Sequence, residues 1–259
     1  MAIIASWNIN SVRIRVEILK EFISEIKPDI ILLQEIKCTN EEFPDFFSSL
    51  NYELIVNGQK GKYGVAILIR KELNFKSIEL KNEILSSESR TNFIYVDKFD
   101  LNILNVYTPN GNPIEDKKKF NFKISWLSEI KKVSTYFINN LDNLLIAGDF
   151  NVLENKSDVL NFNDWENDAL GCYESRKIFR EILSSGLTNV VRIFKKPGTS
   201  FSYWDYQRAC WERNDGLLID HFLISPKYLK FVKNINFGSK YRGMTKPSDH
   251  IPIWINLDI

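Results

Sequence analysis

The sequence predicts an α/β fold built from layers of sheet and helix, and three observations support this prediction. The chain has 259 residues, of which 44% are hydrophobic and 26% charged, so it can form a sizeable core. Eight short apolar runs have the length of strands and end at polar, glycine or proline residues. Three longer segments with helical periodicity lie between them, so strands and helices are interspersed along the chain.

The predicted strands are rich in β-branched residues and carry apolar side chains on both faces, which is typical of buried sheets. In chain order they span residues 2–7, 29–35, 63–69, 91–96, 101–107, 143–150, 217–224 and 251–257.

The predicted helices span residues 12–26, 116–138 and 174–185. In the first, apolar residues recur on one face, Ser11 is a plausible N-cap, and Pro28 lies just beyond the end. Gly186 is well placed to terminate the third helix.

Composition narrows the class of protein further. No linker-like tract, repeat or low-complexity segment interrupts the chain, so a single domain of residues 1–259 is expected. A formal net charge of +1 argues against a protein that binds nucleic acid through a high overall positive charge, although local basic patches remain possible.

Cys38, Cys172 and Cys210 are odd in number, far apart and without CxxC spacing. Neither a disulfide framework nor a zinc site is therefore expected, and the thiols should be reduced. No signal peptide or membrane span is predicted.

Polar side chains end or interrupt six predicted strands. They are Asn8, Glu35, Tyr107, Asp149 with Asn151, Asp220 inside the apolar run of residues 217–224, and Asp249 with His250 just before the last strand. Each alone has an ordinary explanation, such as turn formation or capping. Strand ends in layered sheets gather at one edge, however, where binding and catalytic groups concentrate. Together they predict a site at that edge.

The residue types favour hard-cation and phosphate chemistry. Glu35, Asp149 and Asp249 offer the oxygen ligands that Mg²⁺ prefers. Asn8 and Asn151 can hold a phosphate or a water molecule without adding negative charge. No cluster of thiols or histidines indicates zinc.

His250 is one of only two histidines and lies in the segment KPSDHIPIW. Asp220 is the candidate partner that would raise the pKa of His250 and favour an imidazolium able to stabilise charge developing on phosphorus. Strand alternation would separate Asp249 from His250, so both are expected on the loop before the strand, near Pro247. The same alternation predicts that His221 points away from the site.

Seven segments resemble, in order and spacing, the exonuclease III family of apurinic/apyrimidinic endonucleases: SWNINSVR, LLQEIK, GQKGKYGVAIL, VYTPNG, IAGDFNV, GLLIDHFLIS and KPSDHIPIW. The resemblance covers roughly residues 3–257. It implies a four-layer α/β sandwich of two packed mixed sheets flanked by helices. It also implies Mg²⁺-dependent hydrolysis, with Mn²⁺ as a substitute, of the phosphodiester 5′ to an abasic site, leaving a 3′-hydroxyl. Removal of 3′-blocking groups and 3′→5′ exonuclease activity on duplex DNA are further family activities.

The resemblance also implies roles for individual residues. The catalytic set would be Tyr107, Asp149, Asn151, Asp220 and His250. The metal environment would be Glu35 as principal ligand, with Asn8, Asp249, Asp149 and Asn151. The identity of the general base stays open.

Substrate contacts are predicted at three places. Lys60 and Lys62 lie between glycines that permit close backbone approach to a phosphate, and Asn110 belongs to the TPNG segment. The segment TSFSYWDY resembles the family's aromatic loop, so Tyr203, Trp204 and Leu217 are expected to line a pocket for a flipped, baseless sugar. Further basic clusters, each more often a solvated face, are Lys117–Lys119 with Lys123, Arg192 with Lys195 and Lys196, and Lys240 with Arg242.

Leu218 stands where the family commonly has arginine, which leaves the balance of endonuclease and exonuclease activity open. The resemblance predicts a cytoplasmic, nucleoid-associated monomer that acts on double-stranded DNA with abasic sites or blocked 3′ ends. The alternatives are a phosphatase or RNA-directed nuclease of the same superfamily, and a non-catalytic DNA-binding protein.

Overall fold

The computed structural model describes all 259 residues and contains two six-stranded mixed sheets. The first has the order β11-β12-β1-β2-β4-β3 and comprises β1 (Ala2–Asn8), β2 (Ile30–Gln34), β3 (Tyr52–Asn57), β4 (Val65–Arg70), β11 (Val232–Phe237) and β12 (Ile253–Leu257). The second has the order β5-β6-β7-β8-β10-β9 and comprises β5 (Phe75–Ser77), β6 (Thr91–Val96), β7 (Leu101–Tyr107), β8 (Leu144–Asp149), β9 (Thr188–Asn189) and β10 (Asp220–Ile224).

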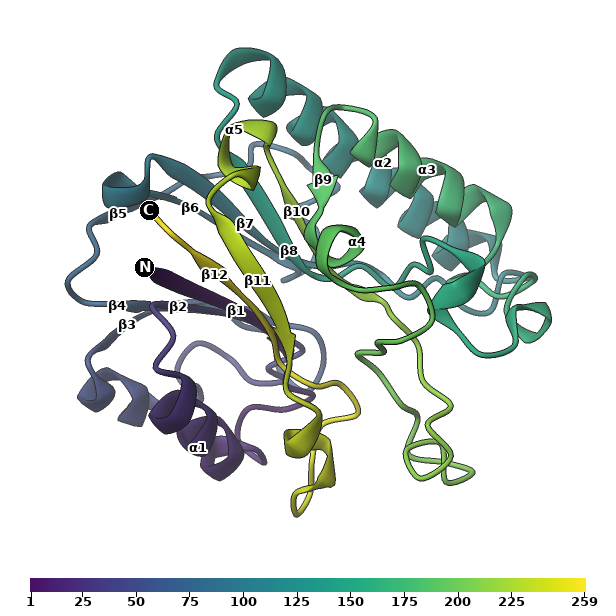
Figure 1. Ribbon diagram of the computed structural model, residues 1–259, viewed down its shortest axis with the longest axis horizontal. Coiled ribbons are helices and arrows are strands. Elements are labelled where there is room, and N and C mark those ends of the chain that lie inside the picture. The colour runs from purple at the N-terminus through teal and green to yellow at the C-terminus, as the bar shows by residue number, and fades with distance from the viewer.

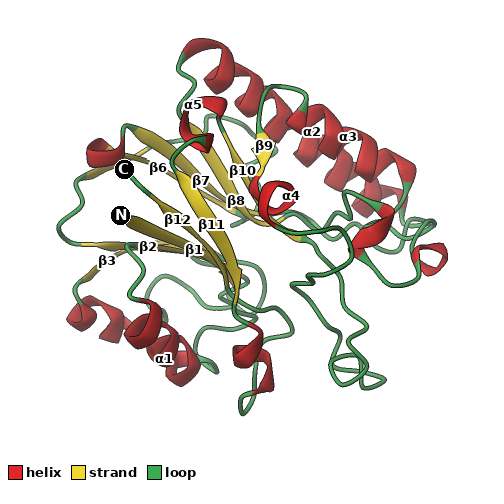
Figure 2. Ribbon diagram, viewed as in Figure 1, coloured by secondary structure: helices red, strands yellow, loops and turns green.

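Helices cover the outer faces of both sheets (Figure 1). Helix α1 (Val16–Ile26) packs on the first sheet, and α2 (Lys117–Asn140) and α3 (Tyr173–Leu183) pack on the second. Of two short helices, α4 (Val190–Phe194) lies between β9 and β10 in the chain, and α5 (Pro226–Leu229) lies between β10 and β11. The layers therefore run helix, sheet, sheet, helix, and the predicted four-layer sandwich is confirmed (Figure 2).

Strand alternation explains the three main layers of core. In β1, Ile4 faces the second sheet and joins the largest apolar cluster, whereas Ala5 and Trp7 face α1. In β7, Ile103 faces the first sheet and Leu104 faces α2. Because both faces of each central strand are buried, these strands read as continuous apolar runs. For this reason all eight predicted strands could be recognised from the sequence.

The first helix begins later than predicted. It starts at Val16, and Ser11 does not cap it but adopts a φ of 83°. The backbone of residues 9–12 instead hydrogen-bonds to the segment after β2, with Ser11 N donating to Glu35 O at 2.7 Å. The loops that follow β1 and β2 are therefore tied together, which fixes the backbone at Glu35. Gly186, as predicted, lies just past α3, with a φ of 118°.

Polar links join the two sheets near one end. Gln34 donates through Nε2 to Asn105 Oδ1 at 2.7 Å, and Asn105 donates in turn to the carbonyl oxygens of Leu33 and Ala66. All of these groups are buried, so their hydrogen bonds are costly to break and hold the sheets in one relative position.

Two expectations from composition concern the whole chain. Cys38, Cys172 and Cys210 form no disulfide. None of the helices combines the length and apolar character needed to cross a membrane.

Candidate active site

The predicted site residues gather at one edge of the sandwich, opposite the chain termini. β1 runs parallel to β2, and β7 runs parallel to β8, so the carboxyl ends of all four strands lie at this edge. β10 and β12 are antiparallel to β8 and β1, so they begin there. This topology brings the ends of six strands together, as the sequence indicated.

A cavity of about 350 Å³ opens between these strand ends. The predicted residues that line it are Asn8, Glu35, Tyr107, Asn110, Asp149, Asn151, Tyr203, Leu217, Asp249 and His250. A larger hollow of about 620 Å³ lies near β3 and β6 and contains none of the predicted site residues.

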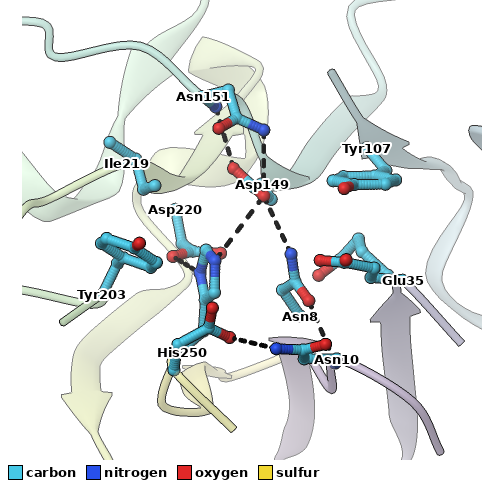
Figure 3. A network of polar contacts seen from close by, with 12 residues as sticks. Asn8, Asn10, Glu35, Tyr107, Asp149, Asn151, Tyr203, Ile219, Asp220 and His250 are labelled. Carbon is cyan, nitrogen blue, oxygen red and sulfur yellow. Dashed lines mark hydrogen bonds and ion pairs between the residues drawn. The ribbon is translucent and has the colours of Figure 1, made fainter. Parts of the chain in front are cut away.

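His250 is held in one orientation at the floor of the cavity. Its Nδ1 lies 2.8 Å from Asp220 Oδ2, and its Nε2 faces Asp149 Oδ2 at 3.8 Å (Figure 3). The ring of Tyr203 packs edge-on at 4.9 Å between centroids. His250 and Asp249 lie on the loop before β12, as strand alternation required. The bond to Asp220 leaves Nε2 available to a group bound in the cavity.

The charges around His250 favour its imidazolium form. Burial alone would disfavour that form, but the carboxylates of Asp220 and Asp149, the hydrogen bond to Asp220 and the charge of Asp249 outweigh it. They raise the pKa of His250 to about 10. At neutral pH His250 is therefore a cationic donor.

Asp149 is buried opposite His250 and accepts three hydrogen bonds. They come from Asn8 Nδ2 at 2.9 Å, Asn151 Nδ2 at 3.1 Å and the backbone N–H of Asn151 at 2.9 Å. Burial raises the pKa of Asp149 to about 7, with the positive charge of His250 acting to lower it and the negative charge of Asp220 to raise it. A carboxylate with this pKa can exchange a proton near neutral pH.

Asn151 connects Asp149 to the loop after β7. Its backbone is left-handed, with a φ of 49°, and its Nδ2 also donates to Thr108 O at 3.0 Å. Asn110 donates through Nδ2 to Asn151 Oδ1 at 3.3 Å. Two amide side chains from neighbouring loops are thereby directed at the same side of the cavity.

Glu35 lies on the opposite side of Asn8 from His250 (Figure 3). Its side chain is 20% exposed, and its carboxylate pairs with Lys37 Nζ at 2.8 Å. Lys37 also donates to Asn10 Oδ1, and Asn10 Nδ2 donates to Asp249 Oδ1 at 2.9 Å. A polar chain thus crosses the cavity rim from Glu35 to Asp249.

The side chains here fit a hard divalent cation held partly by substrate. No group of three or more histidine, cysteine, aspartate or glutamate side chains converges on one point. Mg²⁺ usually needs only one or two protein carboxylates, with water and substrate phosphate completing its ligands. Glu35, open to the cavity and beside Asn8, meets that description. The assignment of Asp149, Asn151, Asn8 and Asp249 to the metal environment stays a prediction.

Tyr107 closes the cavity beside Glu35. Burial and the nearby carboxylates of Glu35 and Asp149 raise the pKa of Tyr107 well above its usual value. The guanidinium of Arg90 lies 4.8 Å from the ring centroid of Tyr107 and makes a cation–π contact with this ring. Tyr107 is therefore a protonated donor.

The apolar wall of the cavity differs in part from the prediction. Tyr203 and Leu217 line it, but Trp204 does not. Trp204 is 3% exposed and packs between Phe201 and Trp211 in the core, because residue 204 points to the opposite side of the chain from residue 203. The prediction for Trp204 was wrong.

Five lining residues were missed: the apolar Trp165, Leu170 and Ile219, and the polar Asn112 and Asp168. Ile219 directly precedes Asp220, so the prediction that β10 reaches the site could have revealed it. Trp165 and Leu170 belong to an irregular segment with no strand or helix pattern, so the sequence carried no signal for them.

Several residues of the further basic clusters, for which a solvated face was the more frequent explanation, are buried or form ion pairs. Lys123 is completely buried, Arg192 pairs with Glu154 and Asp158, and Lys240 pairs with Glu25. Lys60 and Lys62 are exposed on the loop between β3 and β4 and lie outside the cavity, so their contact with DNA stays a prediction.

Leu218 and His221 are both buried in the core, outside the cavity. Leu218 is buried in the core between the sheets and does not line the cavity, so its side chain forms no part of the cavity wall. His221 is enclosed by Phe150 and Phe179, with ring contacts to Asn189 and the Val152 carbonyl. It points away from the site, as predicted.

This geometry defines a hydrolase that acts on phosphate esters. Residues 5–250 match the model of the endonuclease/exonuclease/phosphatase family. The chain is 30% identical to exodeoxyribonuclease III of Haemophilus influenzae, over 96% of this chain and 97% of the relative. The chain belongs to the endonuclease/exonuclease/phosphatase family.

Two solved structures share the whole fold. One is an AP endonuclease from Archaeoglobus fulgidus, with a TM-score of 0.91, 28% identity and complete coverage of both chains. The other is a 3′ phosphatase from Neisseria bound to a product DNA hairpin, with a TM-score of 0.91, 27% identity and complete coverage of both. The predictions of the family branch, the layered fold and a hydrolytic DNA-repair nuclease are confirmed.

Proposed function

We propose that this protein is a Mg²⁺-dependent nuclease that hydrolyses the phosphodiester 5′ to an abasic site in duplex DNA. The product would carry a 3′-hydroxyl. The observation that carries this proposal is the pairing of His250 and Asp149 at the floor of a cavity whose far wall is apolar. The polar side suits a phosphate, and the wall of Tyr203, Leu217 and Ile219 suits a sugar without its base.

His250, Asp149 and Glu35 have different roles in the proposed reaction. His250 donates from Nε2 to a non-bridging phosphate oxygen and stabilises the charge that develops there. Asp149, held by Asn8 and Asn151, orients a water molecule for attack on phosphorus and accepts its proton. The bond from phosphorus to the 3′ oxygen breaks, and that oxygen takes up a proton from solvent water to become the new 3′-hydroxyl. Mg²⁺, held by Glu35 with Asn8 and Asp249 nearby, would neutralise phosphate charge and stabilise the leaving oxygen.

Removal of 3′-phosphates is a second activity supported by a specific finding. The Neisseria structure of the same fold is described as a 3′ phosphatase and holds product DNA. His250, Asp149 and Glu35 would act in the same way on a terminal 3′-phosphate, and this reaction would not require a sugar to be bound against the apolar wall. We propose that the protein does both as a monomer on double-stranded DNA.

A substrate panel tests the proposal. Duplexes with one abasic site, a 3′-phosphate or no damage would be compared with single-stranded RNA and a phospholipid head group, all in Mg²⁺. We expect the fastest turnover on the abasic duplex. Preference for RNA or for the phospholipid head group would overturn the DNA assignment, and DNA binding without turnover would indicate a non-catalytic protein.

Replacing Glu35 with glutamine is expected to raise the Mg²⁺ concentration needed for half-maximal activity. The amide keeps the shape of the side chain but loses the charge that attracts the cation. Titrating Mg²⁺ at saturating DNA measures this, and Glu42→Gln on the exposed surface is a matched control. An unchanged Mg²⁺ requirement would show that another carboxylate is the main ligand.

Replacing Asp220 with asparagine is expected to move the alkaline limit of activity to lower pH. The imidazolium is the active form of His250, so activity is lost as pH rises through the pKa of this group. Asp220 helps to raise that pKa to about 10, and its removal lets burial lower the pKa. A kcat profile across the neutral and alkaline range measures the shift. If the kcat of Asp220→Asn declined at the same alkaline pH as that of the wild type, Asp220 would not set the pKa of His250.

A further inference from the structure

Lys123 is a buried lysine in the N-terminal part of α2, and it forms no ion pair. Its residue is 0% exposed. Its ammonium donates to three main-chain carbonyl oxygens: Asn110 at 2.9 Å, Asn151 at 2.6 Å and Ala169 at 2.7 Å. An ammonium has three N–H donors, so each of them has one acceptor.

A buried charge of this kind is costly. Removing an ammonium group from water disfavours the charged form, and burial lowers the pKa of Lys123 to about 7. A methionine would fill a similar volume without that cost. The ammonium therefore contributes something that apolar packing cannot, namely three directed hydrogen bonds.

The three carbonyls belong to three different loops around the cavity. Asn110 lies after β7, Asn151 lies after β8, and Ala169 stands between the cavity residues Asp168 and Leu170. The side chains of Asn110 and Asn151 line the cavity and bond to each other. One side chain thus joins the loops of Asn110 and Asn151, on the polar side of the cavity, to the loop that carries Trp165 and Leu170.

The local backbone needs such support. Asn151 has a φ of 49° and Gly111 a φ of 86°, both in the left-handed region. The chain at Gly111 packs directly on the lysine stem, since a methyl group added there would lie 2.6 Å from Lys123 Cδ. The turn and the lysine therefore fix each other's position.

We propose that Lys123 is a positioning residue for the nuclease reaction, whose ammonium holds the Asn110 and Asn151 backbones so that both amide side chains face the phosphodiester. The inference rests on the proposed function. It assigns a role to a lysine that never contacts DNA. Small displacements of orienting groups lower kcat more than they change substrate affinity, because orientation counts mainly in the transition state.

The test compares Lys123→Met with Lys132→Met, a matched change of an exposed lysine on the same helix. We expect Lys123→Met to lower kcat on an abasic duplex by about 10- to 100-fold with little change in KM. Lys132→Met should keep the wild-type kcat. Thermal unfolding and circular dichroism establish that each variant is folded, and Lys123→Gln replaces Lys123→Met if the latter does not fold.

A double-mutant cycle with Asn110→Ala separates positioning from general stability. If Lys123 acts through Asn110, the loss from Lys123→Met will be smaller in the Asn110→Ala background than in the wild type. Fully additive losses, or a folded Lys123 variant with the wild-type kcat, would overturn the inference. A wild-type protein that cleaves none of the DNA substrates would instead refute the proposed function.

Discussion

Replacing His250 with alanine is expected to lower kcat on an abasic duplex by about 10³-fold, the range seen when one oxyanion-stabilising donor is removed. His250 is a buried cation whose free Nε2 faces the cavity, and no other cationic side chain lines that cavity. DNA affinity should change much less, because the donor acts mainly on charge that develops in the transition state. Single-turnover cleavage and separate binding measurements in EDTA would distinguish the two effects.

His221 provides the matched control, as the only other histidine in the chain. It is buried against Phe150 and Phe179 and takes no part in the cavity. Replacing it with asparagine should lower the unfolding temperature and leave the kcat of the folded protein nearly unchanged. A His250→Ala variant with near-normal kcat would remove His250 from the proposed mechanism.

Replacing Asp149 with asparagine is expected to lower kcat by about 10²- to 10⁴-fold, the contribution typical of a positioned general base. An amide cannot accept the proton of an attacking water molecule. The change also removes a negative charge from a phosphate-binding cavity, so DNA should bind at least as tightly. Gel-shift affinity and single-turnover rates on the same duplex measure both effects.

Asp164→Asn is the control for this change, since Asp164 is exposed and does not line the cavity. It should leave both affinity and rate as in the wild type. A full rate for Asp149→Asn would point to another base and would reopen the assignment that sequence alone left unsettled.

The central strands and the catalytic groups could be predicted because buried strands and the residues that end them are local patterns. β6 and β7 lie where their apolar runs predicted them, and Asp149 is the last residue of β8. The predicted partnership of His250 and Asp220 depended on two strands starting at one edge. The antiparallel pairing of β12 with β1 in the first sheet, and of β10 with β8 in the second, provides this. Short edge strands such as β5 and β9 carry too few residues to show a pattern.

The wrong predictions share a physical cause, which is that burial of a side chain is decided by tertiary packing. Lys123 is indistinguishable in the sequence from its exposed neighbours on α2, yet it alone points at three loop carbonyls. Trp204 and Tyr203 are adjacent aromatic residues, and only the course of the backbone decides which one faces the cavity. Which of these side chains is buried therefore depends on the tertiary fold and not on the local sequence.

The most direct test of the account is cleavage of a duplex that carries one abasic site, with the ends of the products mapped. The account predicts a single nick 5′ to the lesion with a 3′-hydroxyl, present in Mg²⁺, absent in EDTA and lost in His250→Ala. A nick on the 3′ side, or a nick that persists in EDTA or in His250→Ala, would contradict it.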